Sequence, residues 1–367
     1  MRVALLYGGA SPEHAISCRS AKTMYQECRK EGHTVIPIGI SLDGRWSIQQ
    51  LDPNNLPLEL PTAFIESSEV SLIPSRGLFV NGEQLKIDVC FPVTHGTQGE
   101  DGMIQSLCEL AHLPYVGSNV VTSALCMDKF YTKTIIRSEH IATLDARCIT
   151  YSEYSDTDFV SDFAHGVLQS LGKDLIFKPN DGGSSIGIEV VINATKESII
   201  KACKKVFAYS DTVLVEPYVH NAVELECALI FKDGILEASL PGLIEKSQQK
   251  EFLFLDYEQK YDLQHAATII APAPLSSDVA HELMFMAREI GNILRIDTYA
   301  RCDFLYDPQT QQLYFNEINT IPGLTSQSHY PTLAQQLKLN WSKLIHLWLT
   351  QAKDRFKQQQ RINQSLV

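Results

Sequence analysis

Hydrophobic residues along the first third of the chain alternate between short continuous runs and helix-like spacing. The apolar run at residues 3 to 7 ends in Gly8-Gly9, which predicts a buried strand and a turn, and the following stretch predicts a helix to about Arg29. The runs "HTVIPIGIS" and "KIDVCFPVTHG" predict two further strands, so the chain opens with a βαβ unit and a parallel sheet. "GMIQSLCELAHL" predicts an amphipathic helix with apolar positions 103, 104, 107, 110 and 111. We expect a first, Rossmann-like α/β domain over residues 1–125.

The middle of the chain repeats this alternation. A helix after residue 129 is followed by a polar acidic connection around "YSEYSDTDF", a strand "DLIFKP", a glycine-serine loop and a strand "IGIEVVI". A helix after Thr195 and a strand "TVLVEPYV" complete the segment. The pattern predicts a central α/β domain over residues 126–220.

The last third begins with a hairpin signal. "VELECALIF" and "GILEASL" flank Asp233-Gly234, a turn typical of paired strands. The polar tract 245–265 has no clear period, and such a long irregular segment in a compact domain is typical of a functional loop. The helix "DVAHELMFMAREIGNIL", the strands "ARCDFLYD" and "LYFNEIN" and a closing helix from residue 332 predict a third domain over 221–367. The polar tail "KDRFKQQQRINQSLV" is expected to fray.

Charge and cysteine usage exclude several classes of protein. The 367 residues include 31 Lys and Arg against 43 Asp and Glu, a net charge of −12 that disfavours nonspecific binding to nucleic acid or anionic lipid. Nine cysteines are scattered without a CxxC pair, which is typical of a reducing compartment. The apolar stretch of "MRVALLYGG" is too short for a signal peptide, and no segment approaches the roughly 18 apolar residues of a membrane span. We expect a cytoplasmic protein without nucleic-acid or membrane partners.

Two predicted strands near the C-terminus carry oxygen ligands. Asp303 lies in "ARCDFLYD", and Glu317 and Asn319 lie two residues apart in "LYFNEIN", so that strand alternation points the latter two to one face. Carboxylate and amide oxygens suit Mg²⁺, which also keeps waters and substrate phosphates. Arg301 shares the face of Asp303 and is either an ion-pair partner or an oxyanion clamp. A solvated strand face is the alternative interpretation, and the rigid "NTIPG" loop that follows argues against it.

The stretch "FKPNDGGSSIGI" is a candidate phosphate site. Lys178 ends a predicted strand, and the glycines and serines at 182 to 187 supply free backbone N–H groups and hydroxyls, the parts of an anion-binding nest. It is not a Walker loop, because a strand follows instead of a helix and no Gly-Lys-Ser/Thr is present. An ordinary flexible hairpin is the alternative.

Three further stretches have both structural and functional interpretations. His95 in "HGTQGEDG" ends a buried strand, where ligands gather in open α/β sheets, although a lone histidine is more often structural. Lys260 and Tyr261 in "DYEQKY" belong either to a site or to a charged surface turn. "YGGASPEH" lacks a G-x-G-x-x-G pattern and predicts a turn that delivers Glu13 towards a substrate. Together the residues indicate a multi-domain α/β enzyme that handles a nucleotide phosphate with Mg²⁺.

Seven stretches between residue 3 and about residue 335 follow one another in the order that a known protein family shows. They are "GGASPEHAIS", "HGTQGEDGMIQSLCELAHLPYVGS", "SALCMDK", "KPNDGGSSIG", "DYEQKY", "ARCDF" and "NEINTIPGLTSQSHYP". This series resembles the D-alanine:D-alanine ligase family of the ATP-grasp fold. The resemblance implies three α/β domains, with ATP held between the second and third and the amino acids where all three meet.

The resemblance also implies roles for individual residues in binding ATP and metal. The ATP phosphates would be bound by Lys129, Lys178 and Lys260, with Lys260 at the γ-phosphate. The adenine would be bound by Glu216, Tyr218 and Val219, and the ribose hydroxyls by Glu224. Two Mg²⁺ ions, with Mn²⁺ as an alternative, would be bound by Asp303, Glu317 and Asn319.

For the amino acids, the implied catalytic and substrate-binding residues are Glu13, His95, Ser184, Tyr261, Arg301, Gly323, Ser328 and His329. Glu13, assisted by His95, would pair with the ammonium of the first D-alanine, and Ser184 and Tyr261 would hydrogen-bond to Glu13. Arg301 and the Gly323 N–H would stabilise the tetrahedral oxyanion. The implied reaction joins two D-alanines through an acyl phosphate for peptidoglycan synthesis, with the 245–265 tract closing over the intermediate.

Three residues depart from the family pattern. Pro217 stands where many members have a charged or polar residue, and Leu255 stands where an aromatic is common. His329 stands where members that use D-alanine have Leu or Met and relatives that use D-serine have a polar residue, so a D-alanine:D-serine ligase is an alternative. An ATP-grasp protein that binds without turnover is a second alternative, against which the intact Lys178 and Arg301 argue. A homodimer is the family expectation.

Overall fold

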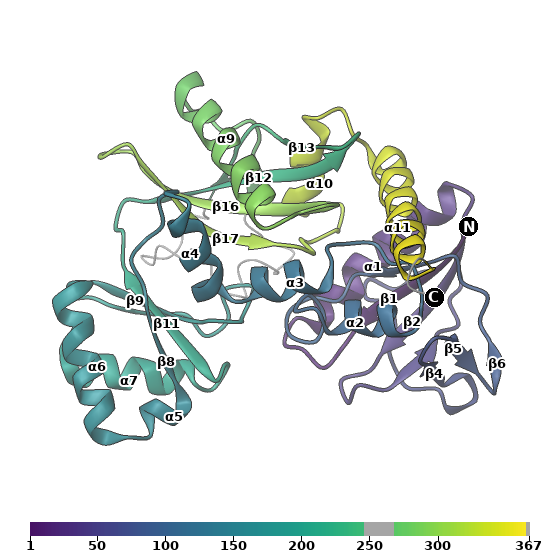
Figure 1. Cartoon of the computed structure of the whole chain (residues 1–367), viewed down its shortest axis with the longest axis horizontal. Helices are drawn as coiled ribbons and strands as arrows, with labels where there is room; N and C mark the ends of the chain where they lie inside the picture. Colours follow the sequence, from purple (N-terminus) through teal and green to yellow (C-terminus); the bar gives the residue numbers. More distant parts are fainter. Residues whose placement is uncertain (246–267, 365–367) are drawn as a thin grey trace.

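The computed structural model describes residues 1–245 and 268–364, which form three lobes that each contain a β-sheet (Figure 1). The N-terminal lobe has a four-stranded sheet in the order β3-β2-β1-β7, and the central lobe has another in the order β10-β9-β11-β8. The C-terminal lobe has a six-stranded sheet, in which β12 and β16 lie at the centre. The arrangement confirms the predicted α/β class.

The N-terminal sheet is the predicted βαβ unit. Its elements are β1 (Arg2–Gly8), α1 (His14–Lys30), β2 (Thr34–Ile40), β3 (Trp46–Ile48) and β7 (Val89–Pro92). β1 pairs in parallel with both β2 and β7. Strand alternation divides β1 between two cores, because Leu5 packs in the cluster with α1 while Leu6 packs in the cluster with α2 (Met103–Leu110).

Two features of this lobe differ from the sequence pattern. A small antiparallel sheet, absent from the prediction, consists of β4 (Val70–Ile73), β5 (Gly77–Val80) and β6 (Glu83–Gln84), next to the 3₁₀ turn η1 (Glu66–Ser68). The predicted apolar face of α2 is partly wrong, since Met103 and Leu110 are each 56% exposed. The inward stripe instead follows i, i+4 and i+7 spacing through Ile104, Cys108 and Ala111.

The central lobe is an antiparallel sheet covered by helices. Its elements are β8 (Arg147–Thr150), α5 (Tyr151–Tyr154), α6 (Thr157–Ser170), β9 (Leu175–Pro179), β10 (Glu189–Val191), α7 (Lys196–Val206) and β11 (Thr212–Pro217). The predicted acidic connection is wrong, because its residues begin two helices. Thr150 and Glu153 form a capping box at α5, and the Asp156 side chain caps α6.

The C-terminal sheet positions the candidate metal ligands. Its elements are β12 (Val223–Lys232), β13 (Ile235–Ala238), β14 (Gly242–Glu245), β15 (Thr268–Ile270), α9 (Ser277–Ile293), β16 (Tyr299–Asp307) and β17 (Gln312–Asn319). The predicted hairpin is confirmed, with Asp233 and Gly234 both at positive φ between β12 and β13. A bulge at Asn316 shifts the register of β17 against β16 beside the candidate ligands.

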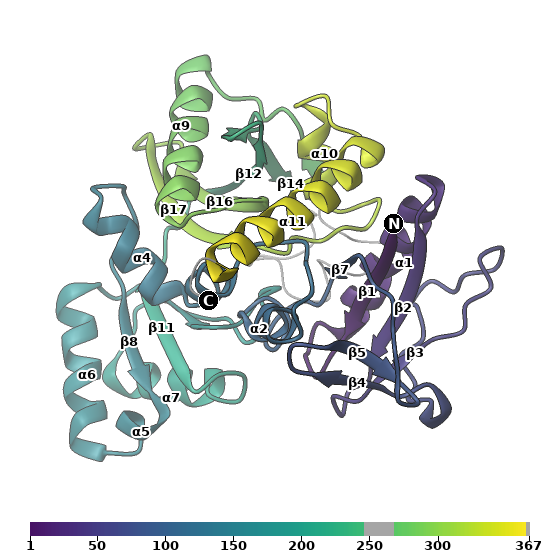
Figure 2. The same ribbon diagram turned by 45° about the vertical axis from the view of Figure 1, so that its right-hand side comes forward.

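Four helices link the lobes: α3 (Val120–Met127), α4 (Lys129–Ser138), α10 (His329–Gln335) and α11 (Trp341–Gln364). The single closing helix expected from residue 332 is therefore two helices, and the expected frayed tail remains helical to Gln364. Arg355 anchors α11 by donating to the backbone carbonyls of Tyr115 and Gly117 at 2.8 and 2.7 Å. Trp348 packs edge-on against Phe91 of β7, so α11 packs against the N-terminal lobe. In Figure 2, α11 runs from α10 towards α2, with β1 and β2 to its right.

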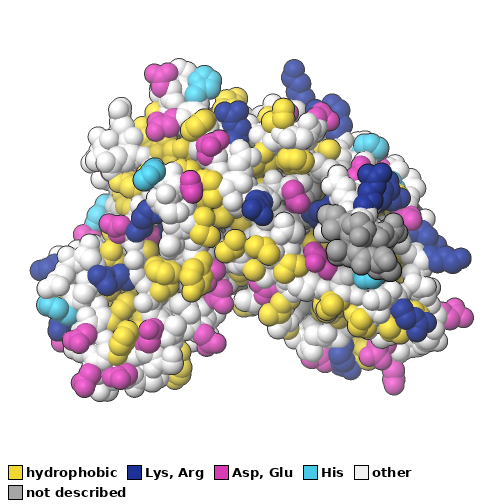
Figure 3. Space-filling view, in the orientation of Figure 1, with side chains coloured by type: hydrophobic (Ala, Val, Ile, Leu, Met, Phe, Trp, Pro, Cys, Tyr) yellow, Lys and Arg dark blue, Asp and Glu magenta, His cyan; other side chains and the backbone are white. Residues whose placement is uncertain are grey.

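The charge pattern on the outside is mixed. Acidic and basic side chains are interspersed on the face shown in Figure 3 and do not gather by sign. Among the described residues, no helix is long and apolar enough to cross a membrane.

Gly166 and Gly291 both lie inside helices but have different surroundings. A Cβ added at Gly166 in α6 would come no closer than 3.7 Å to Arg147, whereas one at Gly291 in α9 would lie 2.3 Å from Leu236 Cδ2. We expect Gly166→Ala to raise the free energy of unfolding by about 1 kcal/mol through reduced backbone entropy. Gly291→Ala gains the same propensity but should lower it by roughly 1–3 kcal/mol through overpacking. Urea unfolding followed by circular dichroism measures both, and shifts of the same sign would contradict this packing of α9.

Candidate functional site

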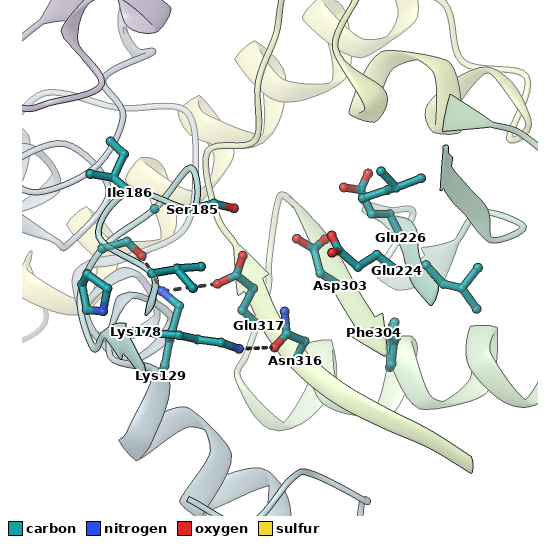
Figure 4. A pocket seen from close by; sticks show the side chains of 16 residues that line it. Lys129, Lys178, Ser185, Ile186, Glu224, Glu226, Asp303, Phe304, Asn316 and Glu317 are labelled. Carbon is teal, nitrogen blue, oxygen red and sulfur yellow. Dashed lines mark hydrogen bonds and ion pairs between the residues drawn. The ribbon is translucent and has the colours of Figure 1, made fainter. Parts of the chain in front are cut away.

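Three carboxylates lie side by side across the C-terminal sheet. Glu226 on β12 is the register partner of Asp303 on β16, and Asp303 is in turn the partner of Glu317 on β17. Glu226 and Asp303 are buried, and all three line one cavity (Figure 4). We call Glu226, Asp303 and Glu317 the acidic row. Like charges this close in a buried setting need positive partners.

Arg301 and Asn319 contact the middle of the acidic row. Arg301 donates to both oxygens of Asp303 at 2.8 and 2.7 Å, and its Nε lies 3.3 Å from Glu226 Oε1. Asn319 Nδ2 donates to Asp303 Oδ2 at 3.0 Å. Burial, opposed by Arg301 and assisted by Glu226, raises the pKa of Asp303 to about 7. In the described residues, one guanidinium therefore contacts two acids in the middle of the row.

The predicted metal ligands Asp303, Glu317 and Asn319 lie close together on β16 and β17, as strand alternation predicted for Glu317 and Asn319. Asp303 and Glu317 are cross-strand neighbours, and Asn319 directs its amide nitrogen to Asp303, which leaves its amide oxygen for another partner. Within residues 1–245 and 268–364, no three His, Cys, Asp or Glu side chains form a complete metal site by themselves. Two carboxylates and an amide oxygen fit Mg²⁺, which takes its remaining ligands from water and substrate phosphates.

Three lysines face this cavity or lie behind it. Lys129, at the start of α4, donates to the Gly182 carbonyl and lies 3.3 Å from Glu317 Oε2. Lys178 on β9 donates to Asn316 Oδ1 at 3.2 Å, a contact drawn in Figure 4. Lys178 also donates to Glu216 Oε2 at 2.8 Å, while Lys133 donates to Glu216 Oε1.

Glu216 is fully buried between these two lysines. Burial alone would raise the pKa of Glu216, but Lys133 and Lys178 lower it to about 2. Both carboxylate oxygens are thus engaged with lysines, so the predicted contact to adenine stays a prediction. Tyr218 packs against His220, and Val219 packs beside Leu305, while Glu224 lines the cavity.

The glycine-serine loop between β9 and β10 reaches the N-terminal lobe. Ser184 and Ser185 have φ values of 53° and 59°, a left-handed backbone that is uncommon outside glycine. Ser184 donates to Glu13 Oε1, which is the predicted hydrogen bond. A Cβ at Gly183 would lie 2.8 Å from Glu13 Oε2, and one at Gly96 would lie 2.6 Å from it. Both glycines therefore make room for this carboxylate.

His95 and Glu100 lie behind Glu13. Burial lowers the pKa of His95 to about 4, so the imidazole is neutral at pH 7, and its Nε2 lies 3.1 Å from Ser20 Oγ. Glu100 accepts from the Gly96 N–H at 3.0 Å. Burial and the charge of Glu13 raise the pKa of Glu100 to about 8. Glu13 and Glu100 are thus two buried acids that lie close together.

The predicted acceptor residues Ser328 and His329, together with Gly323, line the same cavity as Glu13. Ser328 Oγ accepts from the Thr325 N–H at 3.0 Å, and a Cβ at Gly323 would lie 2.8 Å from that oxygen. His329 begins α10, and its Nδ1 lies 3.0 Å from Glu226 Oε2. His329 therefore contacts the end of the acidic row.

Two cavities meet at this site. The first contains Lys129, Lys178, Asp303 and Glu317, and the second contains Glu13, His95, Arg301, Asn319, Gly323, Ser328 and His329. Gly183, Glu226 and Glu317 line both. The geometry therefore allows a group bound in one cavity to react with a group bound in the other. Lys260 and Tyr261 lie outside the described residues.

Four residues of the site were absent from the prediction: Glu100, Lys133, Glu226 and Asn316. Two of them carried a usable signal. Lys133 lies four residues after Lys129 on a predicted helix, which places both on one face, and Glu226 is, with Glu224, one of two charges in the mostly apolar run "VELECALIF". Asn316 carried none, since the bulge that directs it into the cavity depends on pairing with β16.

Comparison with known proteins identifies the family. The model of the D-ala D-ala ligase N-terminus matches residues 2–118, and that of the D-ala D-ala ligase C-terminus matches residues 135–350. A D-alanine–D-alanine ligase of Caldicellulosiruptor bescii is 35% identical over 371 residues, covering 100% of this chain and 98% of the relative. One from Thermoanaerobacter sp. (strain X514) is 35% identical over 94% of each chain.

Solved structures agree with the sequence relatives. The D-alanine–D-alanine ligase of Coxiella burnetii aligns with a TM-score of 0.80 at 29% identity, over 100% of this chain and 99% of that one. The VanG D-Ala:D-Ser ligase of Enterococcus faecalis aligns with a TM-score of 0.79 at 28% identity, over 96% and 99%. With its fold, its site geometry and relatives along its whole length in agreement, the chain belongs to the D-alanine–D-alanine ligase family.

Proposed function

We propose that the chain is an ATP-dependent D-alanine:D-alanine ligase that forms D-alanyl-D-alanine through an acyl phosphate, for peptidoglycan synthesis. The observation that carries the proposal is the junction of the two cavities at Gly183, Glu226 and Glu317. A phosphoryl group held by Lys129 and Lys178 would lie next to a carboxylate held by the second cavity. Relatives with this name along the full length support the same reaction.

In the first step, a carboxylate oxygen of the first D-alanine attacks the γ-phosphorus of ATP, and ADP leaves. Lys129, Lys178 and the N–H groups of the glycine-serine loop would hold the phosphates, with Lys260 assisting from outside the described residues. Asp303, Glu317 and Asn319 would hold two Mg²⁺ ions, or Mn²⁺ in their place. A bound metal supplies positive charge that offsets the charge on the phosphoryl oxygens.

In the second step, the amine of the second D-alanine attacks the acyl carbon, releases a proton, and inorganic phosphate leaves. Glu13 would hold the ammonium of the first D-alanine, and the neutral His95 would not repel that cation. A guanidinium has five N–H donors, so Arg301 can bind two acids and still donate to the oxyanion beside the Gly323 N–H. The homodimer, the cytoplasmic location and the absence of nucleic-acid or membrane partners stay predictions.

Glu13→Gln separates the amino-acid site from the nucleotide site. The substitution keeps the shape but removes the charge that pairs with the ammonium, so we expect the KM for the first D-alanine to rise roughly 10- to 100-fold. The KM for ATP should stay within about 2-fold, because Glu13 lies in the second cavity alone. Phosphate release with ATP, Mg²⁺ and varied D-alanine measures both constants.

Glu31→Gln at the exposed end of α1 is the control for loss of one acidic charge. An equal loss of ATP affinity and D-alanine affinity in Glu13→Gln would contradict the assignment of Glu13. An unmodified protein that releases no phosphate with D-alanine or D-serine would instead be an ATP-grasp protein without turnover.

A second acceptor is favoured by one observation, the polar pair of His329 and Glu226 at the acceptor side of the second cavity. A D-serine hydroxyl could hydrogen-bond to this imidazole, which an aliphatic residue could not offer. The alternative function is therefore a D-alanine:D-serine ligase.

His329→Leu tests the acceptor. We expect the substitution to reduce any D-serine use at least roughly 10-fold while D-alanine use changes less than about 3-fold, because only D-serine loses a hydrogen bond. Competition between D-alanine and D-serine, with dipeptides resolved by mass spectrometry, gives the ratio. His281→Leu on the exposed side of α9 is the matched control. A ratio that does not move would exclude His329 as the determinant.

A further inference from the structure

Lys133, Glu216 and Lys178 form a buried row behind the first cavity. They come from α4, β11 and β9, and the exposed fractions of their side chains are 2%, 0% and 7%. Lys178 lines the cavity, whereas Lys133 and Glu216 are not among its described lining residues. Glu216 thus stands between a lysine that faces the proposed nucleotide and one that is hidden from it.

The charges of this row are unequal. Two ammonium groups share one carboxylate, so the three side chains together carry one excess positive charge in a setting with little water. Each carboxylate oxygen binds a different lysine, Oε1 to Lys133 and Oε2 to Lys178. Without Lys133, both oxygens of Glu216 would be available to Lys178, and the pair would be neutral. Such a closed pair binds an additional anion poorly.

We propose that Lys133 is a positioning residue that occupies one oxygen of Glu216 and thereby keeps the charge of Lys178 available for the nucleotide phosphates. The inference rests on the proposed ATP-dependent function, and it assigns Lys133 no contact with the nucleotide. Lys178 already leans towards the cavity, where it donates to Asn316 Oδ1 at 3.2 Å. The phosphates would compensate the excess positive charge of the row.

The ionisation of Lys133 gives the arrangement a pH signature. The charged groups that face Lys133 are Glu216 on β11, Lys178 on β9 and Glu317 on β17. Burial, opposed by Glu216 and assisted by Lys178, lowers the pKa of Lys133 to about 8. Below this pH Lys133 is charged and the row keeps its excess charge; above it Lys133 becomes neutral and the affinity for nucleotide falls.

The variants for the experiment are Lys133→Met, Lys133→Arg and the control Arg137→Met. Met matches the lysine side chain as far as Cε and lacks the charged amine, and Arg keeps a charge that does not titrate below about pH 12. Arg137 lies one turn further along α4 and pairs with Asp145 at the surface, 3.2 Å away, so its loss removes the same charge outside the site. Titration calorimetry with ADP and Mg²⁺ gives Kd, and phosphate release gives KM and kcat.

We expect Lys133→Met to raise the Kd for ADP and the KM for ATP roughly 10- to 100-fold, with the KM for D-alanine changed less than about 3-fold. Lys133→Arg should restore nucleotide affinity to within about 5-fold, and Arg137→Met should leave it within about 2-fold. Unaltered nucleotide constants in Lys133→Met, with a lowered unfolding midpoint alone, would overturn the proposal and leave a structural role. If Lys133→Met does not fold, the pH comparison decides.

In the pH comparison, the KM for ATP of the unmodified protein should rise above about pH 8, whereas that of Lys133→Arg should stay flat to about pH 9.5. Parallel profiles would overturn the proposal. A double-mutant cycle with Lys178→Met adds a second criterion, since Lys133→Met should add less than about 2-fold to the Kd for ADP once Lys178 is gone. If the effects of Lys133→Met and Lys178→Met on the Kd for ADP are fully additive, Lys133 does not act through Lys178. Absence of phosphate release by the unmodified protein would refute the proposed function and leave the ADP measurements as the test of Lys133.

Discussion

The acidic row across β12, β16 and β17 imposes the main constraint on this molecule. Glu226, Asp303 and Glu317 are neighbours in register, and each needs a positive partner because burial and mutual repulsion disfavour three carboxylates. The partners come from different elements: the cations Arg301 from β16 itself and Lys129 from α4, and the imidazole of His329 from α10. Lys129 and His329 reach the row because α4 and α10 pack beside this sheet.

Polar contacts around the acidic row also connect the three lobes. Lys129 and Lys178 join the central lobe to β17, and Ser184 joins the glycine-serine loop to Glu13 of the N-terminal lobe. α11 adds an apolar connection, since Trp348 and its neighbours share a core with β1 and α1. The lobes are therefore joined both by polar contacts at the centre and by the apolar packing of α11.

Local patterns predicted much of this structure. The βαβ unit, the hairpin at Asp233-Gly234 and the common face of Glu317 and Asn319 depend only on strand period and turn chemistry, which neighbouring residues encode. The acidic stretch that starts α5 and α6 was misjudged because the same residue types favour both loops and helix caps. The polar tail of α11 was misjudged because Arg355 is anchored by carbonyls more than 200 residues away in sequence, at Tyr115 and Gly117.

The number of cationic partners decides whether the pKa of each of two buried acids is raised or lowered. No sequence pattern contains this number. Asp303 and Glu216 are both buried, yet the pKa of Asp303 is raised to about 7 and that of Glu216 is lowered to about 2. Asp303 shares one guanidinium with a second acid, whereas Glu216 has two ammonium groups to itself. Among the described contacts, the first arrangement has fewer cations than acids and favours a bound cation, whereas the second has more cations than acids and favours a bound anion. Their placement on β11 and β16 therefore matches a metal and a phosphate held next to one another, which is the pairing that phosphoryl transfer requires.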